Sequence, residues 1–268
     1  MITEVLINGA TSDGRLPVTD STVLRGDGCF EVLRSYAGKV FGMEEHLDRL
    51  ATSATALQIE LPDRVDLIAW VEKTAATLGD GAVRVVVSRG SAVPGHDQSS
   101  NVIVFGHTVD DDYGPARLKT VIAPWHAAGV AWQLAAAKLT SYAPNMSASR
   151  VARAAGYDDA VLLTTDGIVL EGPTFSVAWV VDDVLETPGL ELGILDSITR
   201  RFVLGVARET GIEVEEGAWN LERLGEATEV IAVSTLREVQ PVIEVDERAW
   251  EPGPISEILG KGFAELTG

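Results

Sequence analysis

Cysteine, histidine and lysine are scarce in this chain of 268 residues. Cys29 is the single cysteine, so no disulfide can form within the chain, and such a thiol-poor composition suits a reducing compartment. The four histidines are scattered without the spacing of metal ligands, so we predict no metal site. Lysine occurs at only five positions: 39, 73, 119, 138 and 261.

Positive charge and long apolar runs are also in short supply. Twenty-one basic residues against 40 acidic ones give a formal net charge of −19 at pH 7. That charge repels nucleic acid and anionic membranes, so we expect neither as a partner. No apolar run approaches transmembrane length, and the first residues lack the pattern of a signal peptide. We therefore expect a soluble, cytoplasmic protein.

The familiar glycine-rich motifs are missing too. The pair Gly26-Asp27-Gly28 has neither the dinucleotide nor the P-loop spacing, and no G-x-S-x-G elbow occurs. These absences argue against a dinucleotide or P-loop nucleotide site built on such a loop, and against a serine hydrolase of the nucleophile-elbow type.

The hydrophobic pattern, in a chain that is 46% hydrophobic, predicts a mixed α+β protein. Strands and helices alternate without a strict strand–helix–strand repeat. We expect strands over 29–36, 39–41, 83–88, 101–105, 120–123, 160–165, 168–171, 177–181, 184–185 and 230–233, and helices over 44–57, 65–79, 147–155 and 197–210. An acidic, turn-rich stretch over 110–115 predicts a boundary between a smaller domain, 1–115, and a larger one, 116–268.

Lys138 follows an apolar run over 130–137, and two interpretations are open. Its stem could pack on apolar surface while its ammonium reaches water. Alternatively, the amine could lie in a dry pocket with a lowered pKa, ready to attack a carbonyl carbon.

Other polar residues are similarly ambiguous. Glu171 is either a solvated strand end or a carboxylate facing a protonated ring nitrogen. The start of the 197–210 helix is either a simple N-cap or an anion site built on free amide groups. Ser234 and Thr235 end a strand with two hydroxyls. Arg49 is either a surface arginine or a doubly hydrogen-bonding phosphate ligand.

Taken together, these stretches resemble the fold type IV (class IV) pyridoxal-phosphate-dependent aminotransferases, a family that includes branched-chain, D-amino-acid and (R)-amine aminotransferases and aminodeoxychorismate lyase. Six segments match in the family's order and spacing: 25–34, 45–50, 138–142, 166–172, 193–200 and 233–239. The resemblance implies a two-domain fold in which the larger domain carries the lysine and most of the cofactor contacts.

The resemblance also implies roles for individual residues. Lys138 is similar to the lysine that holds pyridoxal 5′-phosphate as a Schiff base, and Glu171 to the glutamate facing the pyridine nitrogen. The phosphate contacts correspond to Arg49, Ile198, Thr199, Ser234 and Thr235, with Ser234 replacing a glycine often found there. Tyr142 is a candidate cofactor contact, although Ser141-Tyr142 lies three and four residues after the lysine, whereas branched-chain members have an Asn-Tyr pair four and five residues after it. Asp196-Ser197 stands where the family has a glycine-rich proline turn.

Substrate contacts are expected on the first long strand, in the loop over 89–96 and after the strand that ends at Ser234. The candidates are Phe30, Arg34, Tyr36, Arg89, Leu236 and Arg237. The implied partners are an amino acid or amine as donor, a 2-oxo acid as acceptor, and a second copy of the chain, because family members are homodimers.

Three functions remain open on this sequence. The first is a transaminase with ping-pong kinetics. The second is a lyase that eliminates pyruvate from aminodeoxychorismate with the same lysine and cofactor. The third is a binding protein that keeps the fold without the chemistry.

Overall fold

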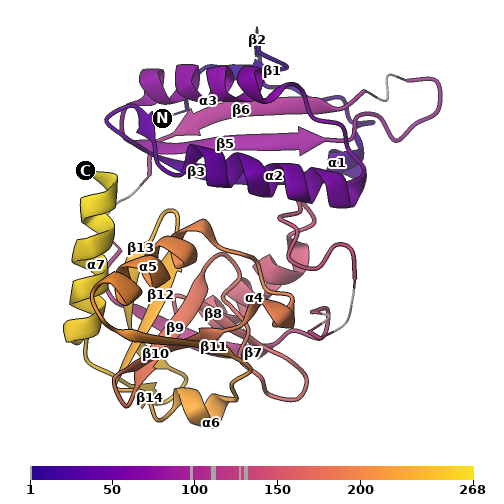
Figure 1. The fold of residues 1–268 in the computed structure, drawn as a ribbon. Helices are drawn as coiled ribbons and strands as arrows, with labels where there is room; N and C mark the ends of the chain where they lie inside the picture. Colours follow the sequence, from indigo (N-terminus) through magenta and orange to yellow (C-terminus); the bar gives the residue numbers. More distant parts are fainter. Residues whose placement is uncertain (1, 97–98, 110–112, 127, 130–131) are drawn as a thin grey trace. The chain divides into compact units, whose positions relative to one another are not determined.

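The protein is described by a computed structural model that covers residues 2–96, 99–109, 113–126, 128–129 and 132–268 (Figure 1). Its contacts divide the chain into two compact units. Unit 1 comprises Met1–Asp110 with Ala137–Tyr142, and unit 2 comprises Asp111–Ala136 with Ala143–Gly268. Within the described residues, no helix combines the length and the apolar character needed to cross a membrane.

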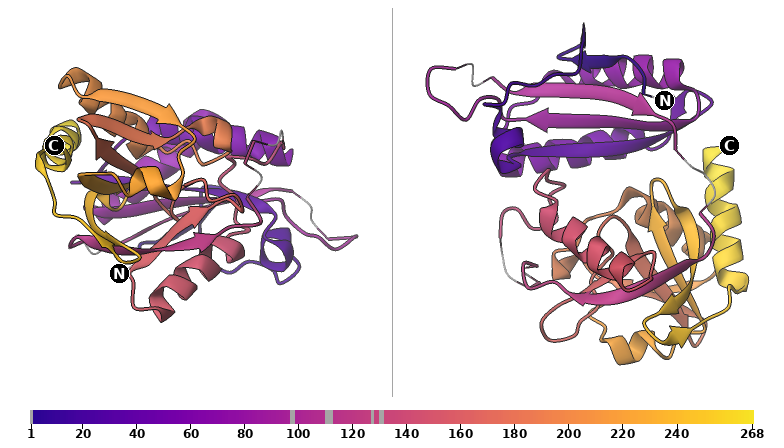
Figure 2. Two further views of the ribbon diagram at one scale, coloured as in Figure 1. Left: turned by 90° about the horizontal axis from the view of Figure 1, so that it is seen from below. Right: turned by 180° about the vertical axis from the view of Figure 1, so that it is seen from behind.

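Unit 1 is an antiparallel sheet covered on one face by two long helices (Figure 1 and Figure 2). The strand order is β2-β1-β6-β5-β3-β4. The strands are β1 Val5–Ile7, β2 Ala10–Ser12, β3 Gly28–Tyr36, β4 Lys39–Val40, β5 Gly81–Ser88 and β6 Asn101–His107, and the helices are α1 Ser21–Arg25, α2 Met43–Leu57 and α3 Arg64–Leu78.

The core of unit 1 is formed by apolar residues at helical spacing on α2 and at alternate positions on β3. Leu47, Leu50 and Ala54 recur along one face of α2 and are buried. They pack against Cys29 and Leu33, which lie two strand positions on either side of Glu31. Glu31 therefore lies at a core-facing position of β3.

Unit 2 is built on a mixed eight-stranded sheet. Seven of its strands follow the order β11-β10-β9-β12-β13-β7-β8, and the eighth, β14, pairs with β13. The pairs β10–β11, β7–β8 and β7–β13 are parallel. The strands are β7 Ala116–Ile122, β8 Asp159–Leu163, β9 Ser176–Val181, β10 Val184–Pro188, β11 Glu213–Gly217, β12 Glu229–Ser234, β13 Glu238–Val245 and β14 Arg248–Ala249, and the helices are α4 Ala143–Ala154, η1 Leu190–Leu192, α5 Ile198–Glu209, α6 Leu221–Leu224 and α7 Pro254–Thr267.

Most predicted helices agree with the structure to within a residue or two, but several local predictions differ from it. Strand β7 begins at Ala116 rather than at residue 120, and β10 continues to Pro188 rather than ending at residue 185. Helix α4 begins at Ala143 rather than Ser147, because Pro144 is tolerated in a first helical turn. The predicted return strand over 168–171 is not a continuous strand. Ile168 pairs with Asn220 and Val169 pairs with Leu163, each as an isolated bridge. After the Asp166-Gly167 turn, the backbone therefore pairs with two different segments in turn.

The placement of Lys138 also differs from the expectation. We expected it in the larger, second domain, but Ala137–Tyr142 packs with unit 1, because its backbone pairs with β3. The boundary predicted near residue 115 stays a prediction; the acidic stretch that suggested it begins at residues 110–112, which lie outside the described residues, as do residues 130–131 of the apolar run before Lys138.

Candidate functional site

The backbone around Lys138 is held in unit 1 by hydrogen bonds on both sides. Cys29 and Leu139 form an antiparallel bridge, and the Phe30 amide donates to the Lys138 carbonyl at 3.0 Å. The Lys138 amide in turn donates to the Ser53 hydroxyl of α2, also at 3.0 Å. This short segment therefore behaves as an extra strand piece beside β3, and the lysine backbone has a fixed place on unit 1.

The amine of Lys138 lies against aromatic rings. Its Nζ is 4.4 Å from the ring centroid of Phe30 and 5.6 Å from that of Tyr142. The two rings meet edge to face, with centroids 5.5 Å apart. Lys138 is half-buried, and its head group is flanked by the two aromatic rings.

A second anchor ties the same segment to the loop before β3. The Thr140 amide donates to the Gly28 carbonyl at 2.9 Å, and its hydroxyl lies 2.8 Å from the Gly26 carbonyl. The Ser141 hydroxyl also donates to Gly26, at 2.9 Å. Gly26 has a left-handed φ of 66°, and a Cβ there would come within 3.0 Å of the Ser141 backbone. Glycine at this position thus allows the close approach of the two backbones.

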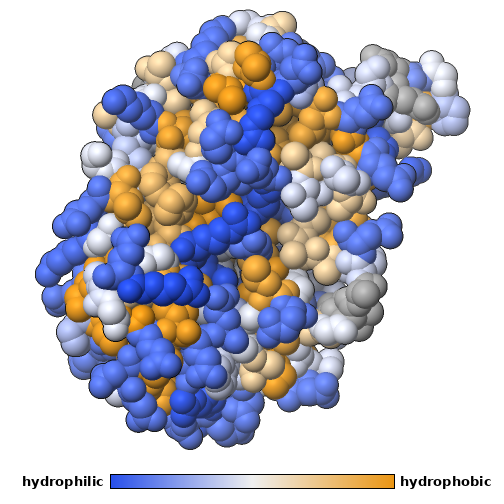
Figure 3. Space-filling view, viewed as in Figure 1, coloured by the Kyte–Doolittle hydropathy of each residue, from blue (hydrophilic) through white to orange (hydrophobic). Residues whose placement is uncertain are grey.

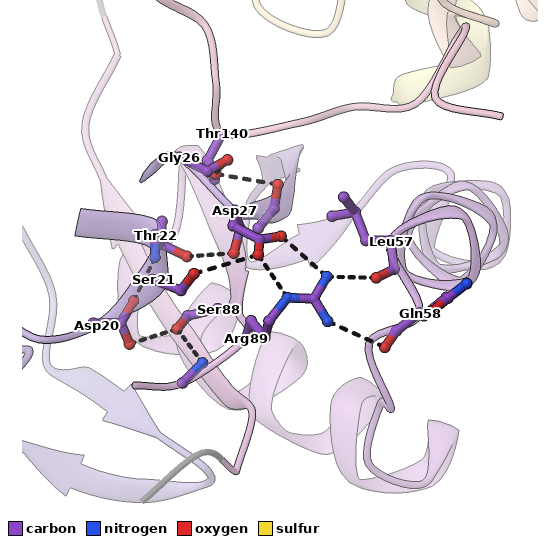
Figure 4. Close-up of polar contacts among 12 residues, drawn as sticks. Asp20, Ser21, Thr22, Gly26, Asp27, Leu57, Gln58, Ser88, Arg89 and Thr140 are labelled. Atoms are coloured by element: carbon purple, nitrogen blue, oxygen red, sulfur yellow. Dashed lines mark hydrogen bonds and ion pairs between the residues drawn. The ribbon is translucent and has the colours of Figure 1, made fainter. Parts of the chain in front are cut away.

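The loop itself is held by Arg89 (Figure 4). Its Nε donates to Asp27 at 2.6 Å and its Nη2 to the Leu57 carbonyl at the end of α2 at 2.5 Å. A weaker contact at 3.4 Å reaches the Gln58 carbonyl. Arg89, predicted as a substrate contact, thus uses its guanidinium to join the loop before β3 to the end of α2.

Arg49, predicted as a phosphate ligand, lies in a buried cluster on the other side of β3. Its Nε and Nη2 each donate to one oxygen of Glu31, at 2.7 Å. His46 Nδ1 lies 2.7 Å from Glu31 Oε2. Glu31 is 0% exposed, His46 1% and Arg49 8%, so a charged pair and a histidine share the unit 1 core.

The protonation of this cluster follows from its surroundings. Burial alone raises the pKa of Glu31, but the Arg49 charge and the hydrogen bonds from Arg49 and His46 outweigh burial and lower the pKa to about 2. Burial lowers the pKa of His46, and the charges of Arg49 and Lys138 act in the same direction, although Glu31 opposes them. At neutral pH, Glu31 is therefore ionised and His46 neutral.

Arg34 and Tyr36, two further predicted substrate contacts, alternate with core residues along β3. Arg34 is 6% exposed, and its guanidinium carbon lies 5.2 Å from the Tyr36 ring centroid. Phe30, Arg34 and Tyr36 share strand parity, so their side chains leave β3 on the face opposite Glu31.

Unit 2 holds the other predicted residues, among them Glu171. Both of its carboxylate oxygens lie near the Leu195 amide, at 3.3 and 3.2 Å. That amide belongs to the loop that leads into α5. Glu171 is half-buried, and its carbonyl accepts from the Leu162 amide of β8 at 2.8 Å. The carboxylate is therefore oriented by the segment that begins the α5 helix.

Ile198 and Thr199 form the first turn of α5 and are almost fully buried. Ser197 is the N-cap, and its hydroxyl accepts from the Arg200 amide at 3.3 Å. The first helical hydrogen bond runs from Arg201 to the Ser197 carbonyl, so the Ile198 and Thr199 amides precede it. The N-cap interpretation therefore describes this helix start, and the anion site stays a prediction, with the Ile198 and Thr199 amides at the positive end of the helix dipole.

Ser234 ends β12, and Thr235 and Leu236 follow it in a turn. The Ser234 hydroxyl accepts from the Arg237 amide at 3.2 Å, which fixes this turn. In β9, Ser176 faces Val233 across the pair. The Ser176 hydroxyl is buried and has no hydrogen-bond partner among the described residues.

Arg237, the last predicted substrate contact, is held inside unit 2. Its Nη2 donates to Asp159 at 2.8 Å and its Nη1 to Gln240, also at 2.8 Å. Its guanidinium carbon lies 4.5 Å from the Phe175 ring centroid. Burial lowers the pKa of Arg237, and Asp159 opposes that shift. These contacts give Arg237 a structural role in joining the turn to β8.

Glu31 and His46 are the residues that sequence reasoning missed. Both lie inside segments that carry the family resemblance, yet neither was assigned a role. The signal was present: a glutamate at a core-facing strand position needs a partner, and His46 and Arg49 lie three residues apart on one helix face. Among the described residues, no cluster of histidine, cysteine and acidic side chains is arranged to hold a metal.

Comparisons with known proteins agree with this architecture. The family described as Amino-transferase class IV matches residues 28–245. A bifunctional aminodeoxychorismate lyase / D-amino acid transaminase of Mycobacterium tuberculosis is 31% identical over 94% of this chain and 92% of its own length.

Two solved structures are similar over nearly the whole chain. A hypothetical aminotransferase from M. tuberculosis in its PLP-bound form has a TM-score of 0.90, with 27% identity over 99% of both chains. The branched-chain aminotransferase of Thermoproteus uzoniensis with norvaline has a TM-score of 0.88, with 26% identity over 100% of this chain and 95% of its own. These similarities confirm the predicted α+β, fold type IV architecture, and the chain belongs to the class IV aminotransferase family.

Proposed function

We propose that this protein is a pyridoxal-phosphate-dependent transaminase that moves an amino group between an amino acid or amine and a 2-oxo acid by a ping-pong mechanism. The observation that carries the proposal is Lys138. The chain belongs to a family of aminotransferases. The backbone beside Lys138 pairs with β3, and the Lys138 amine is flanked by two aromatic rings.

The polar groups of the chain fit this cofactor. Arg49 offers a cation for a phosphate, and α5 offers amides at the positive end of its dipole. When bound, the cofactor supplies an electron sink for charge that develops on the substrate carbon.

In the proposed mechanism, Lys138 would hold the cofactor through Nζ at its aldehyde carbon. When the amino donor occupies that position instead, the free amine of Lys138 would act as the base and acid that moves a proton from the substrate carbon. Glu171 would accept a hydrogen bond from the ring nitrogen and so favour its protonated form.

The phosphate is proposed to bind Arg49, the Ile198 amide, Thr199, Ser234 and Thr235, with Tyr142 as a further cofactor contact. Phe30, Arg34, Tyr36 and Leu236 are the proposed substrate contacts. Arg89 and Arg237 affect the substrate through the segments that they anchor, because their ion pairs engage both guanidinium groups.

A homodimer completes the proposal and rests on the family resemblance, and a cytoplasmic location is proposed from the thiol-poor composition. Light scattering after size-exclusion chromatography tests the dimer: a single species of twice the chain mass of 28.5 kDa is expected. A monomer that retains full activity would contradict it.

Reduction with borohydride followed by peptide mapping tests the enzyme proposal directly. The expected label lies on Lys138, and Lys138→Ala should remove both label and turnover while leaving the circular dichroism spectrum unchanged. Lys119→Ala is the matched control. Lys119 forms an ion pair with Asp246 in unit 2, so its loss should not affect the labelling of Lys138. A label elsewhere, or none, would favour a binding protein without chemistry.

A pyruvate-eliminating lyase is the second candidate, favoured by the relative named as both lyase and transaminase. Incubation with aminodeoxychorismate and no acceptor separates the two. A transaminase stops after one half-reaction, whereas a lyase releases pyruvate continuously. A panel of L-amino acids, D-amino acids and both enantiomers of an aryl amine, with pyruvate and 2-oxoglutarate as acceptors, then identifies the donor.

A further inference from the structure

The buried Glu31–Arg49–His46 cluster is an unusual way to fill a hydrophobic core. Its neighbours in unit 1, such as Cys29, Leu33 and Leu50, are apolar. Burying an ion pair in such surroundings adds little stability, and apolar residues of similar volume often serve as well or better. The cluster therefore calls for a role other than holding the fold together.

The geometry of the cluster fixes the plane of one guanidinium group. Glu31 accepts from Nε and Nη2 of Arg49 at the same distance, 2.7 Å, so the carboxylate and guanidinium planes are aligned edge to edge. A guanidinium has five N–H groups. One N–H on Nε and one on Nη2 donate to Glu31. The other three, both on Nη1 and the second on Nη2, point away from Glu31. That outward edge has the fork geometry that suits a phosphate.

His46 secures the carboxylate from the other side. With Glu31 ionised and His46 neutral, the proton between them belongs to His46 Nδ1, which donates to Glu31 Oε2 at 2.7 Å. His46 and Arg49 lie one turn apart on α2, so the same helix grips the carboxylate with both side chains. The rotamer of Glu31, and through it the orientation of Arg49, is thereby determined.

We propose that Glu31 and His46 are positioning residues that hold the Arg49 guanidinium in the orientation that binds the cofactor phosphate. This inference rests on the proposed function. Glu31 and His46 themselves touch neither the phosphate nor the substrate; they act through Arg49, and removing either one leaves the arginine present but misaligned.

The test compares pyridoxal 5′-phosphate with pyridoxal, which lacks the phosphate. Glu31→Gln keeps the volume but turns an N–H group toward Arg49 and breaks the fork. We expect the dissociation constant of the phosphorylated cofactor to rise about tenfold to a hundredfold, because one charge-assisted pair is lost. The dissociation constant of pyridoxal should change less than about threefold on the same scale. Titration of the apoprotein, followed by tryptophan fluorescence, measures both.

His46 gives the same test with a conservative rescue. His46→Asn places an amide N–H near the Nδ1 position and should keep the ratio of the two dissociation constants close to that of the unmodified protein. His46→Leu removes the donor and should shift the ratio toward that of Glu31→Gln. These variants also serve if Glu31→Gln does not fold.

Glu186→Gln is the matched control. Glu186 is also 0% exposed and paired with an arginine, Arg223, but it lies in unit 2 and has no part in the proposal. The substitution should lower the melting temperature without changing the preference for the phosphorylated cofactor. A similar loss of preference in this control would show that any buried charge defect produces the effect.

A double-mutant comparison completes the test. In an Arg49→Lys background, Glu31→Gln should weaken the phosphorylated cofactor by less than about threefold further, because its effect passes through the guanidinium. Equal weakening of both cofactors, or an undiminished effect in the Arg49→Lys background, would overturn the positioning role. If borohydride labels Lys138 but Glu31→Gln and His46→Leu leave the ratio unchanged, this inference fails while the proposed function stands. A protein with no Lys138 label would overturn both.

Discussion

A single carboxylate, Glu31, carries much of the acid sensitivity that we expect of unit 1. Its folded pKa of about 2 lies below its ordinary value of 4.5, so the folded state favours the ionised form. The stabilisation is fully present above the ordinary pKa and is lost as pH falls from about 4.5 toward 2. The lowered pKa of His46 acts in the same direction, because the unfolded chain takes up that proton first as pH falls below 6.5.

Glu31→Gln should therefore flatten the acid limb of the stability curve. We expect the unmodified protein to lose roughly 3 kcal/mol more than the variant between pH 5 and pH 2, as a shift of this size implies. Urea unfolding at a series of pH values, followed by circular dichroism, measures the difference. Parallel pH profiles for the two proteins would contradict the assignment.

The lone thiol should be unreactive in the folded chain. Cys29 is 0% exposed, and burial, assisted by the charge of Glu31, raises its pKa to about 12. Because the thiolate is the reactive form, Ellman's reagent at pH 8 should titrate no thiol in the native protein and one per chain in 6 M guanidinium. Rapid reaction of the native protein would show that β3 opens readily.

At the scale of one element, β3 connects the proposed chemistry to the core. One face of the strand contributes Cys29, Glu31 and Leu33 to the core, while Phe30 on the other lies against Lys138. The N-terminal residue of the strand, Gly28, accepts from Thr140 and so fixes the lysine segment. A substitution at Gly28 should therefore lower the stability of unit 1 and shift the position of Lys138.

Gly28→Ala tests this element. A Cβ there would lie 2.4 Å from the Val87 carbonyl and 2.6 Å from the Thr22 hydroxyl, so the backbone must shift. We expect a loss of about 2 kcal/mol in the free energy of unfolding, together with slower borohydride labelling of Lys138.

Gly205→Ala provides the contrast. Gly205 lies inside α5, and nothing lies within 4 Å of its Cβ position. Alanine at this position should stabilise the protein by about 0.5–1 kcal/mol, because the substitution lowers the conformational entropy of the unfolded chain and so reduces the entropy lost on folding. Chemical denaturation of both variants should give shifts of opposite sign; two losses of equal size would show that the steric argument is wrong.

At the scale of the whole molecule, the dominant physical property is the charge of −19. Hydrophilic residues dominate the face drawn in Figure 3, with smaller hydrophobic areas among them. Many arginines are already paired with acids, as in Arg64 with Glu44 and Arg117 with Glu244. The remaining acids repel one another across the surface, and this repulsion disfavours the compact state.

Salt should therefore stabilise the protein at neutral pH. Raising NaCl from 10 to 200 mM shortens the screening length, which weakens the net repulsion more than the individual surface pairs, each worth at most about 1 kcal/mol. We expect the melting temperature at pH 7 to rise, as measured by differential scanning calorimetry. An equal concentration of a neutral osmolyte separates screening from solute exclusion, and a fall in melting temperature with salt would contradict the argument.

The sequence by itself determined the class of fold, most helices and the family, because these depend on local periodicity and ordered motifs. Hydrophobic spacing located α2, α3 and α5, and a family resemblance singled out Lys138, Glu171 and Arg49. Ser197 at the predicted helix start suggested an N-cap as one of two interpretations, and the structure shows that cap, since capping involves only neighbouring residues.

Only the tertiary structure decided which residues became partners. Lys138 packs with unit 1 because its backbone pairs with a strand more than a hundred residues earlier, as in the bond from the Thr140 amide to the Gly28 carbonyl across a separation of 112 residues. Arg89 and Arg237 look like carboxylate binders in sequence, but ion pairs with Asp27 and Asp159 engage them. The Glu31–Arg49–His46 cluster exists because a strand and a helix meet. Such pairings depend on how distant segments approach in space, which local patterns do not encode.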